Sequence, residues 1–229
     1  MIPASRRKML TNENNEGFHI QVCGHNSGHF YDIYVPQSVL HVCPVLASRL
    51  SPGCRIYNVH PRIFCIIIAH LNLISTFEQS EWLSTPGYLR ELMRSLPLQT
   101  FVQAWYLCGM LHLPNLQNDI TKVLYDSSVA FLNIFHDSCT QIDPLPFVYL
   151  RSICGSGTKA ESFLFDFYAD VLRNPGWPPD LFQNLPMFVW QGITNSGYQI
   201  SMRDGGVERY VVREDDGTYY GELQIQPAV

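Results

Sequence analysis

The sequence predicts an α+β protein, because strand-like and helix-like periodicities follow one another along its 229 residues. Runs near the start alternate apolar with polar residues and are rich in β-favouring side chains, which is typical of strands. Later runs repeat apolar residues every three to four positions, which is the period of an α-helix. Hydrophobic residues make up 46% of the chain and charged residues 15%, a composition typical of a globular protein with a packed core.

The first elements are a predicted β-hairpin and two short helices. FHIQVCG (18–24) and HFYDIYV (29–35) are the strands, and the turn residues between them reverse the chain. Pro36 ends the second strand, because proline has no N–H to donate to a sheet. Short helices are expected at QSVLH and at CPVLASRL (43–50). Pro44 is compatible with the second of these, because proline is tolerated in a first helical turn.

A third strand and three longer helices are predicted next. CRIYNV (54–59) favours a strand, and HPRIFCIIIAHLNLI (60–74) is apolar on nearly all sides, which indicates a buried helix. PLQTFVQAWYLCGML (97–111) has one apolar helical face. Because the residue before a proline avoids helical geometry, this helix ends by Leu113, and Pro114 opens the next one. The stretch is therefore a predicted αα-hairpin with a tight corner.

We expect apolar side chains from these elements to be buried together in a common core. They are Val35, Leu40, Ile63, Phe64, Ile67, Phe101, Trp105, Leu116 and Ile120.

The last part of the chain changes from helical to strand-like patterns. KAESFLFDFYADVLR (159–173) is a clear amphipathic helix. GYQISMR, VERYVVR and TYYGELQI then favour strands, and the sequences DGG (204–206) and DDG (215–217) between them are typical of hairpin turns. They predict a three-stranded antiparallel meander that packs on the preceding helices or forms a surface for a partner. The predicted organisation is a leader (1–17), a first domain (18–126), a helical extension (127–192) and the β-meander (193–229).

Charge and cysteine content exclude several classes of protein. The formal net charge is −5, so no broad basic face is available for nucleic acid. Seven cysteines at irregular spacing, with no C-x-x-C pair, indicate free thiols and a reducing compartment. The longest apolar run, 64–74, is too short to cross a bilayer, which takes about 20 residues. With no apolar signal segment at the start, we expect a cytoplasmic or nuclear protein without membrane contact.

Several stretches, in their order along the chain, resemble the BTB/POZ domain, and most closely the divergent BTB proteins of filamentous fungi. VPQSVLHVCPVL agrees with the family pattern V-H-K-x-x-L-x-x-x-S-P-x-F at Val35, Leu40 and Pro44 but departs from it elsewhere. YLCGMLHLPNLQNDI (106–120) is similar to the family's Y-x-L-A-D-K-L-x-M-P-x-L-Q-N-x-x-I. The stretch CRIYNVHPRIFCIIIAHLNL and the later FLFDFYADVL also match, although the family's Tyr-Thr-Gly ending is absent. The resemblance covers residues 18–192 and makes 18–126 a BTB/POZ-like domain.

The resemblance implies a non-catalytic adaptor or scaffold that binds proteins and forms a homodimer. BTB dimers bury the first strand and first helices, which here offer Phe18, Ile20, Val22, Val39, Val42 and Val45. Some family members bind cullins through a hydrophobic-x-Glu signature after the buried helix. This chain has TFEQSEW there, with Phe77 and Glu78 adjacent, so cullin binding rests on the family alone. Phe77, Glu78 and Trp82 form the candidate partner surface.

Catalytic and metal-binding functions have weaker signals. Cys23, His25 and His29 are close in sequence, but C-x-H-x3-H lacks the paired spacing of zinc modules. GSGTK (155–159) lacks the glycine before the lysine and the hydroxyl after it that a phosphate loop needs, and favours a link into the next helix. No nucleophile motif is present. We expect no cofactor, no bound metal and no catalytic residue. The alternative is an enzyme or metal-binding protein on an unrecognised α+β fold.

Overall fold

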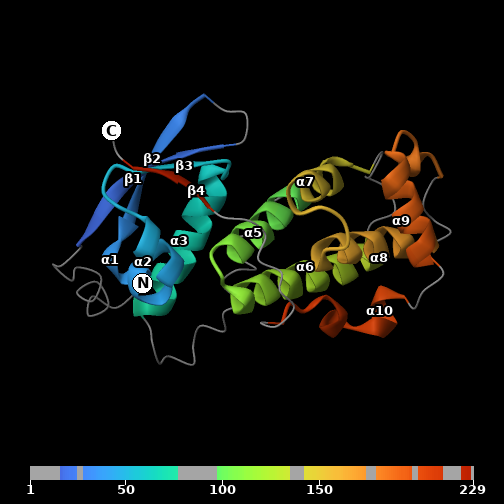
Figure 1. Ribbon diagram of the computed structural model, residues 1–229. Helices are drawn as coiled ribbons and strands as arrows, with labels where there is room; N and C mark the ends of the chain where they lie inside the picture. Colours follow the sequence, from blue (N-terminus) through green and yellow to red (C-terminus); the bar gives the residue numbers. More distant parts are fainter. Residues whose placement is uncertain are drawn as a thin grey trace, which may run out of the picture. The chain divides into compact units, whose positions relative to one another are not determined.

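The computed structural model describes residues 16–24, 28–76, 97–134, 142–173, 179–197, 201–213 and 223–227. The chain divides into two compact units. Unit 1 comprises Met1–Ser80 with Leu223–Val229, and unit 2 comprises Glu81–Glu222. The predicted α+β class is confirmed, since strands and helices share unit 1 and helices build unit 2 (Figure 1).

Unit 1 contains a mixed four-stranded sheet. Its strands are β1 (Gly17–Cys23), β2 (Phe30–Pro36), β3 (Arg55–Tyr57) and β4 (Gln224–Gln226), in the spatial order β2-β1-β3-β4. The predicted hairpin is confirmed, because β1 and β2 pair antiparallel along their whole length. β3 pairs parallel with β1, and β4 pairs antiparallel with the other edge of β3.

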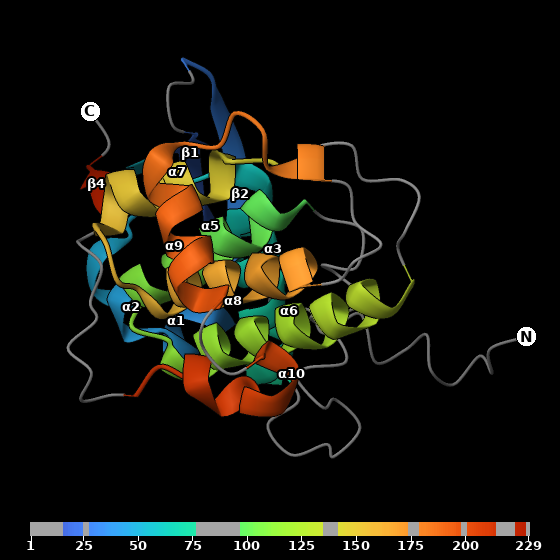
Figure 2. The same cartoon turned by 90° about the vertical axis from the view of Figure 1, so that its right-hand side faces the viewer.

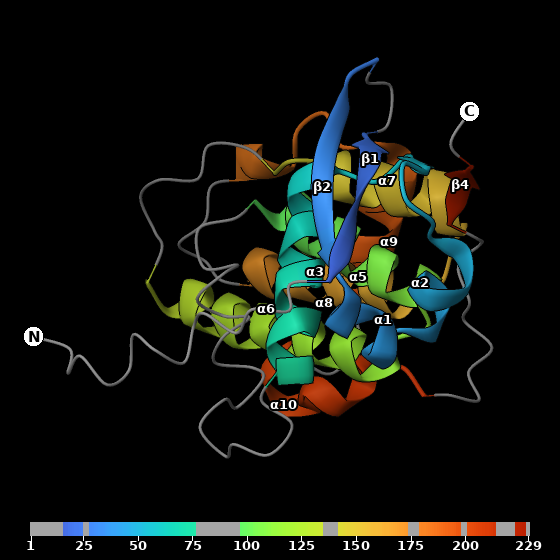
Figure 3. The same cartoon turned by 90° about the vertical axis from the view of Figure 1, so that its left-hand side faces the viewer.

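One face of this sheet forms the core of unit 1. Ile20, Val22, Ile33, Val35 and Ile56 are buried, as the alternation of side chains along a strand requires. The helices α1 (Gln37–Val42) and α3 (Pro61–Thr76) pack against strands of this sheet and against each other. Figure 3 shows α3 behind β1 and β2. The short α2 (Pro44–Arg49) begins at a proline, as predicted.

Unit 2 begins with the predicted αα-hairpin, formed by α5 (Leu98–Met110) and α6 (Pro114–Ile134). The corner is a Schellman motif: the N–H of Leu113 donates to the carbonyl of Cys108 at 2.9 Å, and that of His112 to Gly109 at 3.1 Å. His112 takes the left-handed φ of 55° that this motif requires. α6 continues past residue 126, the predicted end of the first domain.

The remaining helices of unit 2 surround α8 (Lys159–Arg173), which contacts α6, α7 (Leu145–Cys154) and α9 (Met187–Gly197). Figure 2 shows α6 beside α8 and α9 in front of it. A short 3-10 turn, η2 (Pro179–Phe182), precedes α9. Along α8, apolar side chains such as Phe163 and Leu164 are buried, as its amphipathic period predicts.

The predicted three-stranded meander at the C-terminal end is wrong. Residues 202–205 form the short helix α10 and 207–210 the 3-10 turn η3, whereas β4 pairs with β3 of unit 1. Met202 and Tyr210 of these two elements are buried, and so is Val212, which follows them. Short β-favouring runs depend on what they pack against, and here burial on helices decides the local structure. Residues 201–213, named the C-terminal segment below, dock on α6 and α8.

The expectation of one common core is only partly met. Eight of the nine expected core side chains are buried, and Leu40 is partly exposed. The buried ones divide between the two units. Those of unit 1 are Val35, Ile63, Phe64 and Ile67, and those of unit 2 are Phe101, Trp105, Leu116 and Ile120.

Candidate functional site

The side chains predicted for a dimer interface lie at two depths in unit 1. Three are fully buried in its core: Ile20, Val22 and Val39. Three are partly exposed: Phe18, Val42 and Val45. In this conformation only the second set offers apolar contact surface to another copy of the chain.

Other predicted site residues fall outside the described residues. These are Phe77, Glu78 and Trp82 of the candidate partner surface and His25 of the considered metal cluster. Cys23 is buried and His29 is exposed. Among the described residues, no group of three or more His, Cys, Asp or Glu side chains is arranged to hold a metal ion.

The sheet face opposite the core of unit 1 carries aromatic and arginine side chains. We name it the aromatic sheet face: His19, Phe30, Tyr34, Arg55 and Tyr57. The rings of His19 and Tyr34, which are paired across β1 and β2, lie 5.4 Å apart. Phe30 meets Tyr57 edge to face at 5.4 Å, and the Arg55 guanidinium lies 5.1 Å from the Phe30 ring centre.

Polar contacts hold these side chains in place across the four strands. Arg55 Nε donates to Gln21 Oε1 at 2.9 Å, and the Tyr57 hydroxyl donates to Gln226 Oε1 at 3.0 Å. His19 Nδ1 lies 3.2 Å from Asp32 Oδ2. The contacts reduce the rotamer freedom that binding would otherwise remove. Tyr, Phe and Arg held on an exposed face are typical of protein-binding surfaces.

The aromatic sheet face was not predicted from the sequence, although the sequence carries a signal for it. The alternation in HFYDIYV that predicts a buried row with Ile33 and Val35 also places Phe30 and Tyr34 in the opposite row. Large aromatic residues in the solvent row of a strand are the feature that could have identified it.

Unit 2 contains a second cluster, built on buried carboxylates of α8. Glu161 accepts a hydrogen bond from Arg151 Nε of α7 at 3.2 Å and another from the Gly157 amide at 2.6 Å. The Glu161 amide donates to Thr158 Oγ1 at 3.0 Å, so Thr158 caps the start of α8. The spacing T-K-A-E is that of a capping box, which the sequence already carries as a signal for a helix start. The predicted link into the next helix is confirmed, with positive φ at Gly155 and Gly157.

Two further carboxylates of α8 bind the C-terminal segment. Asp166 accepts a hydrogen bond from the Tyr210 hydroxyl at 2.6 Å and lies 3.2 Å from Arg209 Nη2. Asp170 accepts from Ser201 Oγ at 2.8 Å and from the Met202 amide at 2.9 Å. Burial, and then the hydrogen bond to Asp166, raise the pKa of Tyr210 well above its ordinary value. The Tyr210 hydroxyl holds its proton at neutral pH and donates it in the hydrogen bond to the carboxylate of Asp166.

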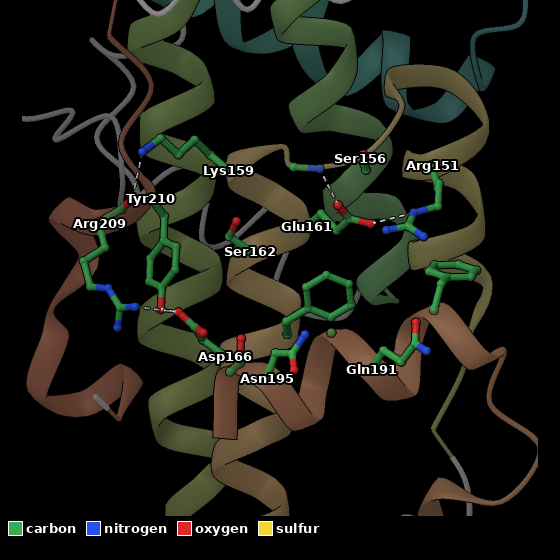
Figure 4. Close-up of a pocket in the computed structure, with 15 residues that line it drawn as sticks. Arg151, Ser156, Lys159, Glu161, Ser162, Asp166, Gln191, Asn195, Arg209 and Tyr210 are labelled. Atoms are coloured by element: carbon green, nitrogen blue, oxygen red, sulfur yellow. Dashed lines mark hydrogen bonds and ion pairs between the residues drawn. The ribbon is translucent and has the colours of Figure 1, made fainter. Parts of the chain in front are cut away.

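A pocket of about 610 Å³ lies beside this cluster, lined by α7, α8, α9 and η3. Figure 4 shows Lys159, Ser162 and Asp166 along α8, Gln191 and Asn195 on α9, and Arg209 and Tyr210 opposite Arg151. The side chains of Ser162, Gln191 and Asn195 make no hydrogen bond to another described residue. The pocket therefore offers polar groups that a ligand can use.

Comparisons of the chain with family models, with curated proteins and with solved structures return no match. Within the part of the chain that the structure describes, no helix has both the length and the apolar character needed to cross a membrane.

Proposed function

We propose that the chain is a non-catalytic protein–protein interaction protein of the BTB type, acting as an adaptor or scaffold in the cytoplasm or nucleus. The order of its elements supports this proposal. A hairpin, two short helices, a strand, a long helix and an αα-hairpin follow one another as in the predicted BTB-like pattern. Fold alone does not determine activity, so the function depends on which surface the protein presents.

The observation that carries the proposal is the aromatic sheet face. In protein interfaces a few residues carry most of the binding energy, and these are most often Tyr, Trp and Arg. Phe30 and Tyr34 are each 36% exposed while their rings remain packed against neighbours. A partner therefore meets a surface that is apolar and already ordered. A protein partner fits this face better than nucleic acid, given the net charge of −5.

Affinity purification from the native cell, with mass spectrometry of the bound proteins, tests the proposal. We expect the Phe30→Ala, Tyr34→Ala double variant to lose its specific partner. Recovery of that partner should fall about tenfold or more, since a loss of about 1.4 kcal/mol of binding free energy lowers the affinity tenfold. Tyr31→Ala is the matched control, because Tyr31 lies on the same strand, is 55% exposed and points to the other side. Equal recovery of every partner by the double variant and the control would contradict the proposed surface.

Self-association is a separate part of the proposal, and it rests on the BTB resemblance. We expect light scattering to give the mass of a homodimer, and Val42→Asp with Val45→Asp to convert it to a monomer. Val148→Asp, an exposed position of unit 2, is the control. A native protein that stays monomeric at high concentration would refute the homodimer and leave the aromatic sheet face as the proposed partner surface. Cullin binding rests on the family alone.

A further inference from the structure

Cations outnumber carboxylates among the side chains that line the pocket of unit 2. Three cations, Arg151, Lys159 and Arg209, line it together with two carboxylates, Glu161 and Asp166. Each carboxylate lies 3.2 Å from one arginine. Lys159 has no carboxylate partner among the described residues, and its Nζ donates instead to the carbonyl oxygen of Arg209 at 3.3 Å. A single negative charge on a ligand would therefore balance the charged side chains that line the pocket.

Amide side chains provide the second feature of the pocket. Gln191 and Asn195 are four residues apart, so they lie on one face of α9. Each offers both donors and an acceptor, the pattern that an amide group of a ligand requires. Unit 2 already uses such a contact: Asn118 donates to the Val212 carbonyl at 3.0 Å and accepts from the Val212 amide at 2.7 Å.

Aromatic rings provide the third feature. Phe165 and Phe188 line the pocket, and the Arg151 guanidinium lies 4.1 Å from the centre of the Phe188 ring. Phe165 lies directly against the backbone of α9 at Gly192, where a Cβ would collide with the ring. These rings form an apolar wall beside the polar groups.

We propose that this pocket binds a monocarboxylate that is joined through an amide to an apolar group, which is the chemistry of a peptide C-terminus or of a free N-acyl amino acid. Lys159 binds the carboxylate, Gln191 and Asn195 bind the amide, and Phe165 with Phe188 contacts the apolar group. A phosphate monoester fits less well, because it carries nearly two charges at neutral pH. The volume of about 610 Å³ is within the usual range for small-ligand sites.

This inference goes beyond the proposed interaction function. The pocket belongs to unit 2 and the aromatic sheet face belongs to unit 1. Substitutions in one unit therefore test one idea without testing the other.

Isothermal titration calorimetry with two matched probes tests the proposal. N-acetyl-L-phenylalanine carries the carboxylate, and N-acetyl-L-phenylalaninamide lacks its charge. We expect the full-length protein to bind the acid about tenfold or more tightly than the amide, because a charged hydrogen bond is lost. Equal affinity for both probes, or no heat of binding by the acid up to about 10 mM, would overturn the proposal.

Variants locate the binding in the pocket. Lys159→Gln should remove the preference for the acid over the amide probe, whereas Lys122→Gln, at an exposed position of α6, should keep it. Asn195→Ala should lower the affinity for both probes by a similar factor. If Lys159→Gln folds and still prefers the acid as the native protein does, the assigned site is wrong.

The two sources of the ligand are distinguished by a third probe, an octapeptide that ends in phenylalanine with a free carboxylate. Tighter binding of the octapeptide than of N-acetyl-L-phenylalanine supports a protein C-terminus as the ligand. Tighter binding of the short acid supports a free N-acyl amino acid. The same octapeptide with a C-terminal amide is the control. If it binds as tightly as the octapeptide with the free carboxylate, recognition of the carboxylate is contradicted.

Discussion

Tyr210→Phe should destabilise unit 2, because it removes one hydroxyl group from a buried contact and leaves the ring in place. The Tyr210 hydroxyl donates to Asp166 Oδ2 at 2.6 Å, and the two residues are 1% and 5% exposed. A hydrogen bond to a charged group contributes about 1.5–3 kcal/mol. Phenylalanine keeps the edge-to-face contact with Phe163 at 5.1 Å, so little packing is lost.

The remaining contacts of Asp166 limit the size of this effect. Arg209 Nη2 stays 3.2 Å from Asp166, so the carboxylate is not left without a cation, which would cost about 3–5 kcal/mol. We therefore expect the free energy of unfolding to fall by about 1.5–3 kcal/mol. With a typical urea m-value of about 1–3 kcal/mol/M, the midpoint should fall by roughly 1 M.

Urea unfolding followed by tryptophan fluorescence measures this change. All four tryptophans of the chain lie in the sequence of unit 2, so the signal reports on that unit. Tyr149→Phe is the matched control, because the Tyr149 hydroxyl makes no hydrogen bond to another described residue. We expect the control to change stability by less than about 0.5 kcal/mol. If Tyr210→Phe shifts the midpoint no more than Tyr149→Phe, the contact with Asp166 does not hold the C-terminal segment.

Three other predictions follow from buried contacts. Asn118→Ala removes both side-chain hydrogen bonds to the docked C-terminal backbone and should cost about 1–3 kcal/mol in the same urea assay; an unchanged midpoint would contradict this role. Gly192→Ala places a methyl group against the Phe165 ring and should cost about 1–3 kcal/mol, whereas Gly197→Ala, which meets no neighbour, should be tolerated. Burial lowers the pKa of His70 from 6.5 to about 4, so the unfolded chain binds its proton first as the pH falls. Stability should therefore decrease by up to about 3 kcal/mol between pH 6.5 and 4, and His70→Gln should lack this part of the decrease when unfolding is followed by circular dichroism.

Elements with a local cause were predictable from the sequence. Pro36 ends a strand, and Pro114 opens a helix after a corner at Leu113, because proline restricts its own backbone and that of its neighbour. The period of apolar residues along 98–110 and 159–173 likewise determines which helix faces are buried. The order of elements up to the αα-hairpin follows from such signals. The aromatic row of β2 also had a sequence signal, which was missed.

Contacts between distant parts of the chain were decided by the tertiary structure. β4 pairs with β3 although 169 positions separate Tyr57 from Gln226, and no local pattern specifies that partner. The C-terminal segment favours strands by composition but forms helical turns, because Asp166 and Asp170 of α8 bind its polar groups. The sequence by itself determined the elements that a proline bounds or that carry a regular apolar period, since those signals depend only on neighbouring residues. Only the tertiary structure decided which buried carboxylates meet which partners, because a short segment takes the conformation that satisfies the groups it packs against.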